Sequence, residues 1–215
     1  MENGKYNNKN KSTTRFFSMS PNDCTKTVIN AAEEAKKKTK HTIIAVKLDN
    51  ETNEFVFYTI GPQLFCTRNK EFGKIEPVKN TKFIKPVGGL WTSTYTPEEE
   101  YPSAWIEWCI REEPEWIKDV NFFLLVPKEN AQIYVIDCYE DLERLYSKFG
   151  ISSEVGLTIM DWEEIAKHYD GVMLTEAGQI HTRYSRPLSL YGWDCESTVW
   201  FRDVFEGVKK IEINI

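Results

Sequence analysis

Strand-like and helix-like segments are mixed along this chain, with no regular βαβ alternation. Residues 42–48 and 54–60 are rich in β-branched and aromatic side chains, and a short polar stretch separates them, which predicts a β-hairpin. Parallel strands need long crossover connections, whereas hairpins produce antiparallel pairs. The pattern therefore predicts the α+β class, with mostly antiparallel split sheets and flanking helices.

Helix-start signals indicate where the helices lie. Ser20 before Pro21 predicts a helix that runs to about residue 39. A second helix is expected from Ser103 until Pro114 stops it. Two acidic capping boxes predict the others, which are Asp137 with Glu140 before a helix that ends at Gly150, and Asp161 with Glu164 before a helix that ends at Asp170-Gly171. The first of these two helices is expected to place one stripe of side chains inward: Leu142, Leu145, Tyr146 and Phe149.

The remaining segments read as strands and loops. Residues 83–90 are strand-like but interrupted by Pro86 and Gly88-Gly89, while 61–80 are expected to form a loop or a short extra strand, and 176–196 a long loop. The other predicted strands are 121–127 and 131–137 around a tight connection, 172–175, 197–201 and 208–213.

Composition divides the chain into three parts. Residues 1–14 are rich in Asn, Lys, Ser and Thr and are predicted to be a disordered leader. Residues 15–80 are expected to form an N-terminal subdomain or extension with a helix and a β-hairpin, and residues 81–215 an α+β core. Residues 1–40 carry a net charge of +5, although the whole chain has a net charge of −6. Nucleic acid could therefore bind only through this basic segment. The alternative is that the segment is a solvated leader without a binding role.

Cysteine usage and hydropathy favour a cytoplasmic protein. The five cysteines are scattered and form no C-x-x-C pair, which argues against a zinc site and for reduced thiols. No apolar run is long enough to span a membrane, and the N-terminus lacks the apolar region of a secretory signal. We therefore expect no metal and no membrane partner.

All seven tryptophans lie between Trp91 and Trp200, several of them beside glycines, prolines and carboxylates. Tryptophan serves both cores and ring-binding clefts. Four aromatic side chains are candidates for stacking on a ligand ring, with a core role as the alternative: Trp91, Trp105, Trp108 and Tyr169.

Two short segments carry polar groups that suit chemistry. In residues 85–93, Lys85 and the hydroxyls of Thr92 and Ser93 flank two glycines, so that backbone N–H groups could meet a ligand amide or phosphate; the alternative is a bulged edge strand. Glu196 opens an apolar strand after Trp193 and Asp194. A carboxylate held there suits charge stabilisation or general-base chemistry, and the alternative is a surface acid at a strand end.

Together, these segments and the Asp161-Trp162 and Tyr169-Asp170-Gly171 motifs resemble a group of uncharacterised bacterial and phage proteins that is distantly similar to the ADP-ribosyltransferase fold. The resemblance spans about residues 85–201. It implies an NAD-dependent transferase, of the kind used by phage effectors or toxins, that transfers ADP-ribose to a macromolecular acceptor. Glu196 would be the catalytic carboxylate, and Tyr95 or Tyr169 would stack on nicotinamide. The full set of implied cofactor-binding residues is Lys85, Gly89, Leu90, Trp91, Ser93, Tyr95, Trp105, Tyr169 and Trp193.

Three alternatives remain open. The family's first-strand histidine and its arginine have no counterpart here, which favours a non-catalytic module that binds a nucleotide, an ADP-ribose derivative or a protein. A structural protein whose tryptophans are core residues is the second alternative. The third is a glycoside-processing enzyme, which needs two opposed carboxylates.

Overall fold

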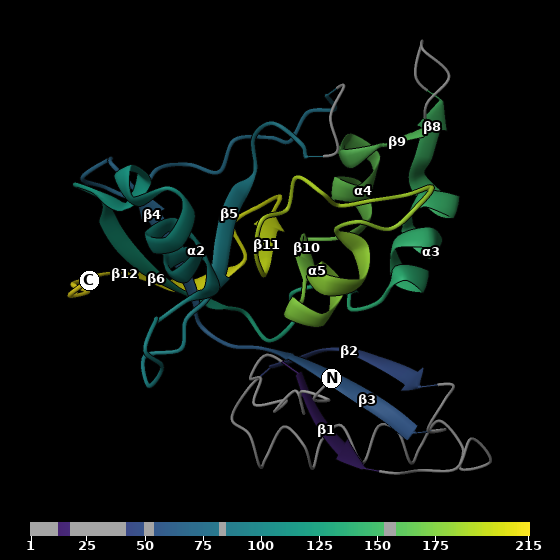
Figure 1. Cartoon of the computed structure of the whole chain (residues 1–215), viewed down its shortest axis with the longest axis horizontal. Helices are drawn as coiled ribbons and strands as arrows, with labels where there is room; N and C mark the ends of the chain where they lie inside the picture. Colours follow the sequence, from purple (N-terminus) through teal and green to yellow (C-terminus); the bar gives the residue numbers. More distant parts are fainter. Residues whose placement is uncertain (1–12, 18–41, 50–53, 82–84, 153–157) are drawn as a thin grey trace, which may run out of the picture.

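The computed structural model describes residues 13–17, 42–49, 54–81, 85–152 and 158–215. In these ranges it contains a seven-stranded sheet that is antiparallel except at one strand pair, two smaller antiparallel sheets and four α-helices (Figure 1). The predicted α+β class and the mostly antiparallel pairing are therefore confirmed. None of the helices within these ranges is both long and apolar enough to cross a bilayer.

The large sheet has the strand order β12-β6-β4-β5-β11-β10-β7. The pair β10 with β7, at one edge, is parallel. The strands span β4 Gln63–Thr67, β5 Leu90–Thr94, β6 Asn121–Pro127, β7 Ile133–Ile136, β10 Gly171–Leu174, β11 Ser197–Trp200 and β12 Phe205–Ile211.

The smaller sheets are formed by β1 Thr13–Phe17, β2 Thr42–Asp49 and β3 Glu54–Ile60 in the order β1-β3-β2, and by β8 Gly150–Ser152 with β9 Thr158–Met160. The pairing of β2 with β3 confirms the predicted hairpin. Of the predicted leader, only Thr13 and Thr14 are described, and they begin β1 instead of a disordered segment. The helix expected at 20–39 lies outside the described residues.

The helices are α2 Ala104–Glu112, α3 Tyr139–Phe149, α4 Trp162–His168 and α5 Glu176–Thr182, with a 3₁₀ turn η1 at Pro114–Ile117. Two predicted caps are confirmed, because the Ser103 side chain accepts from the N–H of Ile106 and the Asp161 side chain accepts from the N–H of Glu164. The N-cap of α3 is Cys138 instead of Asp137. Asp141, and not the predicted Glu140, supplies the capping carboxylate. Its Oδ2 accepts hydrogen bonds from the backbone N–H groups of Asp137 and Cys138.

Strand pairing differs from the sequence expectation in three places. Strand β4 lies between β6 and β5, so the large sheet begins at Gln63 and not at residue 81, where the predicted core starts. The predicted neighbours β6 and β7 lie toward opposite ends of the sheet. Strand β5 starts only at Leu90, because Gly88 and Gly89, with positive φ angles of 79° and 69°, interrupt the strand predicted for residues 83–90. Residues 83 and 84 of that prediction lie outside the described residues.

The predicted loop 176–196 begins with helix α5. Thr175 caps it by accepting from the N–H of Gly178. A glycine and a β-branched terminal residue give this segment a weak helix propensity, which is why the sequence pattern did not predict it. Tertiary contact with β7 and β10 compensates, because Gly178 lies directly against the backbone of Ile136.

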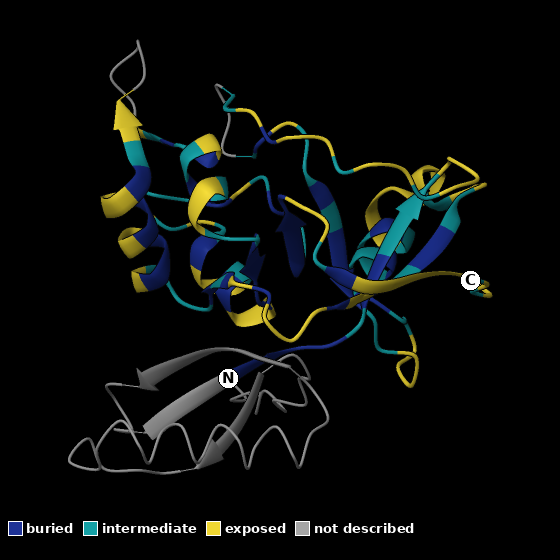
Figure 2. Ribbon diagram, turned by 180° about the vertical axis from the view of Figure 1, so that it is seen from behind, coloured by how far each residue is buried: buried dark blue, intermediate teal, exposed yellow. Residues whose placement is uncertain are grey.

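The helices cover one face of the large sheet. Leu142, Leu145 and Phe149 of α3 and Ile165 of α4 pack with Val172 and Val199 of the central strands, as the predicted inward stripe of α3 requires. Ile106 of α2 packs with Leu64 and Phe122 on the other half of the sheet. Figure 2 shows the central strands buried and the outer helix surfaces and β12 exposed.

Candidate functional site

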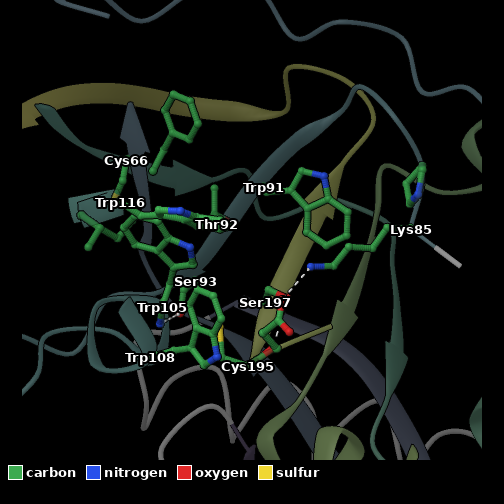
Figure 3. Close-up of a pocket in the computed structure, with 14 residues that line it drawn as sticks. Cys66, Lys85, Trp91, Thr92, Ser93, Trp105, Trp108, Trp116, Cys195 and Ser197 are labelled. Atoms are coloured by element: carbon green, nitrogen blue, oxygen red, sulfur yellow. Dashed lines mark hydrogen bonds and ion pairs between the residues drawn. The ribbon is translucent and has the colours of Figure 1, made fainter. Parts of the chain in front are cut away.

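A pocket of about 290 Å³ opens over β5 and β11 (Figure 3). Strand register places its walls, because Val199 of β11 lies opposite Trp91 of β5, and alternate residues of a strand share a face. Ser93 and Ser197 continue this face into the pocket. The aromatic and apolar lining consists of Leu64, Phe65, Pro86, Trp91, Trp105, Trp108 and Trp116.

Four tryptophans face the cavity from three elements. Trp105 and Trp108 are three residues apart on α2 and so lie on one side of the helix, and Trp116 on η1 packs edge-on against Trp108 with ring centroids 5.6 Å apart. Figure 3 shows these three rings on one side of the pocket and Trp91 with Lys85 on the other. The geometry provides large flat surfaces between which a planar ring can lie.

One ion pair lies in the pocket wall. The Lys85 ammonium is 3.2 Å from the Asp194 carboxylate, and the two side chains are 38% and 36% exposed. Lys85 Nζ also lies 5.2 Å from the centroid of the Trp91 ring, within cation–π range. The pocket therefore offers a cationic donor and an anionic acceptor at a partly solvated position.

The hydroxyl groups at the pocket are occupied by the protein itself. Ser93 Oγ donates to Glu196 at 2.8 Å and accepts from the N–H of Trp105 at 3.3 Å. Thr92 Oγ1 donates to Gln63 at 2.7 Å and accepts from Trp200 Nε1 at 2.8 Å. Burial raises the pKa of the two lining thiols, Cys66 and Cys195, well above its ordinary value, so both favour the neutral, weakly nucleophilic form.

Glu196, the predicted catalytic residue, lies outside the pocket lining and is 7% exposed. Its Oε2 accepts from Ser93 Oγ at 2.8 Å and from the Thr94 N–H at 3.0 Å, and its Oε1 accepts from Thr94 Oγ1 at 2.9 Å. Burial raises the pKa of Glu196, while these hydrogen bonds act in the opposite direction. The carboxylate links the start of β11 to the end of β5.

The structure brings together four of the predicted cofactor-binding residues, which are Lys85, Trp91, Ser93 and Trp105. Trp108, also identified as a candidate ring partner, joins them. The remaining predicted residues have other roles.

Gly89 lies where β5 approaches β11, and a Cβ there would meet a Val199 methyl at 2.9 Å. Leu90 and Trp193 are buried core residues, and Trp193 contacts Trp91 with ring centroids 4.7 Å apart. Tyr95 packs beside α2.

Tyr169 lies away from the pocket and does not line it. It packs against Tyr134 and Phe149 on the α3–α4 side, with ring centroids 5.4 and 6.3 Å away. Neither Tyr95 nor Tyr169 lines the pocket, so neither is in position to stack on a ring bound there.

Sequence reasoning overlooked Trp116, Cys66 and Asp194 as pocket residues. Trp116 comes two residues after Pro114, and a tryptophan just beyond a predicted helix end is a usable sequence signal; the structure leaves it 54% exposed. Cys66 belongs to β4, whose position in the sheet no local pattern indicates. The sequence pattern gives no separate role to Asp194, two residues before Glu196, yet Asp194 is the carboxylate that reaches the pocket.

Among the described residues, no group of three or more His, Cys, Asp and Glu side chains is arranged to hold a metal ion. No family model matches this chain, and comparisons with curated proteins and with solved structures find no similar protein.

Proposed function

We propose that the pocket between α2 and β5 binds the planar ring of a nucleotide, with NAD and ADP-ribose as the first ligands to test, and that binding occurs without turnover at Glu196. The observation that carries the proposal is the convergence of four tryptophans on one cavity while Glu196 stays outside it. Stacking of a base on an aromatic side chain contributes about 1–3 kcal/mol per ring.

The cavity size supports a ring with its sugar instead of a whole dinucleotide. Ligand pockets enclose roughly 300–1,000 Å³, and this one, at about 290 Å³, is at the lower end of that range. One half of NAD or ADP-ribose would lie between the tryptophans, and the rest would extend into solvent.

The ion pair supplies polar recognition at the rim. Because Lys85 and Asp194 are both partly exposed, the ammonium can turn toward a phosphate or carboxamide oxygen, and the carboxylate can accept from a ribose hydroxyl or a ring N–H. Both residues thereby gain a ligand partner without leaving a buried charge unpaired.

The position of Glu196 supports binding without catalysis. A carboxylate that stabilises a developing oxocarbenium charge must face the sugar, but both oxygens of Glu196 already accept hydrogen bonds from β5. ADP-ribosyl transfer remains the competing prediction, and the same experiment tests it.

We would titrate the full-length protein with NAD, ADP-ribose and nicotinamide, following tryptophan fluorescence and calorimetric heat. Saturable binding is expected, and Trp108→Ala should weaken it by roughly 5- to 150-fold, which corresponds to the loss of about 1–3 kcal/mol of stacking. Ile180→Ala removes an exposed apolar side chain outside the pocket and serves as the matched control.

Nicotinamide release from NAD in cell lysate separates the two functions. The proposal predicts none from the wild type. Release that disappears in Glu196→Gln would establish the transferase instead, and release that disappears only in Asp194→Asn would assign catalysis to the pocket carboxylate. Absence of saturable binding to all three ligands would reject the binding function.

A further inference from the structure

A second hollow, of about 600 Å³, lies on the loop that follows α5, between Arg183 and Tyr191. The loop surrounds it with two arginines and two tyrosines, Arg183, Arg186, Tyr184 and Tyr191. This surface is separate from the tryptophan pocket, with which it shares no lining residue.

The loop backbone is fixed by its own serines. Ser185 Oγ is 3.0 Å from the Thr182 carbonyl oxygen and 2.6 Å from that of Leu188. Ser189 Oγ donates to the Arg183 carbonyl at 2.9 Å and accepts from the Tyr191 N–H at 3.0 Å. A loop held in this way presents its other side chains without first having to be ordered by a ligand.

The two arginines carry uncompensated charge. Within the part of the chain that the structure describes, neither guanidinium forms an ion pair, and the buried Nε of Arg183 has no hydrogen-bond partner. The hollow has no acidic lining residue, although the whole chain has a net charge of −6. A guanidinium with free donors is suited to bind phosphate oxygens.

The two tyrosines form an exposed aromatic platform beside these charges. Tyr184 is 74% exposed and Tyr191 is 60% exposed, with ring centroids 5.7 Å apart and an interplanar angle of 55°. The Arg183 guanidinium lies 5.6 Å from the Tyr184 ring. Aromatic side chains that stack bases, next to arginines that bind phosphates, are the combination found where proteins bind single-stranded nucleic acid.

We propose that this loop binds the base and phosphate of a nucleotide unit, either as a free nucleotide or within single-stranded nucleic acid. The base stacks on Tyr184 or Tyr191, and the phosphate accepts hydrogen bonds from Arg183 and Arg186. Residues 41–215 carry a net charge of −11, which opposes a long duplex but tolerates contact with one or two nucleotides. The site lies outside the basic segment 1–40, where the sequence alone placed any nucleic-acid contact.

Fluorescence anisotropy with a labelled single-stranded 12-mer tests the proposal, with the matching duplex, ADP and an acidic peptide as competitors. Arg186→Ala should weaken binding roughly tenfold or more, the loss expected for a hydrogen bond to a charged group. It should also lower the slope of log K against log salt concentration by about one. Lys74→Ala removes one exposed positive charge elsewhere and is the matched control.

Tyr184→Ala should weaken binding roughly fivefold or more, while Tyr184→Phe, which keeps the ring, should restore it. Competition by ADP would identify free nucleotides as the source of the ligand, and binding of the oligonucleotide without such competition would identify nucleic acid. The proposal is overturned if no probe binds at low salt, if Arg186→Ala and Tyr184→Ala leave binding unchanged, or if the acidic peptide competes as well as the oligonucleotide.

Discussion

At the residue scale, Glu196 shows how one carboxylate can join two strands. Glu196 directly precedes β11, at the position that lies opposite the end of β5. Its oxygens accept hydrogen bonds from the N–H and hydroxyl of Thr94 and from the hydroxyl of Ser93. The group is almost fully buried, so the ionised form loses its hydration, and the pKa of Glu196 is raised. Its contribution to stability therefore depends on pH.

The sign of this dependence follows from proton binding. Because the pKa of Glu196 is higher in the folded than in the unfolded protein, the folded state retains a proton that the unfolded state releases between the two pKa values. The free energy of unfolding should therefore fall as pH rises through that interval, beginning near the unfolded glutamate pKa of about 4.3.

Glu196→Gln removes the titration and preserves the size of the side chain. Relative to wild type, this variant should become more stable as pH rises from about 4.3 toward 7. Urea unfolding at a series of pH values measures the difference, with the exposed Glu206→Gln as control. Parallel pH profiles for the wild type and Glu196→Gln would contradict a raised pKa.

At the element scale, α5 depends on tertiary contact. Its sequence contains a glycine where an alanine would favour the helix, yet a Cβ at Gly178 would lie 2.1 Å from the carbonyl oxygen of Ile136. The close approach lets α5 lie against the ends of β7 and β10, where Thr175 caps it and donates its hydroxyl to Asp137. Helix α5 in turn determines where the arginine and tyrosine loop begins.

Gly178→Ala should therefore destabilise the protein although alanine is the better helix former. Overpacking of this kind costs about 1–3 kcal/mol, which exceeds the gain in helix propensity of about 1 kcal/mol. Chemical denaturation measures the change. Gly207→Ala, where an added Cβ meets nothing within 4 Å, is the control and should change the free energy of unfolding by less than about 1 kcal/mol. A stabilised Gly178→Ala would show that α5 can move away from β7.

At the scale of the whole molecule, the three-stranded sheet is attached to the larger sheet through β3. Tyr58, 5% exposed, donates its hydroxyl to Asp137 Oδ2 at 3.1 Å, just after β7 ends. Burial and the neighbouring carboxylate raise the pKa of Tyr58, so the hydroxyl keeps its proton and remains a donor. Strand β2 of the small sheet contacts β7. Figure 1 shows the small sheet on the side of the molecule where α5 lies.

Tyr58→Phe removes this hydroxyl and keeps the ring. The free energy of unfolding should fall by about 2 kcal/mol, as expected for a partly buried hydrogen bond to a charged group. Urea denaturation followed by circular dichroism measures the loss. Tyr184→Phe, on an exposed ring whose hydroxyl forms no hydrogen bond within the described residues, should change it by less than about 0.5 kcal/mol. Equal stability of Tyr58→Phe and wild type would show that other contacts hold the small sheet.

The sequence by itself determined the α+β class, the β2–β3 hairpin, the Ser103 and Asp161 caps and the inward stripe of α3, because each is encoded by residues close together in the chain. It also singled out Trp91, Trp105 and Trp108 as candidate ring partners, and the structure brings these three side chains to one pocket. Only the tertiary structure decided that β4 lies between β5 and β6, that β6 and β7 separate, and that α5 forms against β7. It also decided that Asp194, and not Glu196, reaches the pocket. The choice of strand partners, and the direction of a side chain beyond a strand end, depend on contacts between residues far apart in the chain. The local spacing of apolar residues does not encode such contacts.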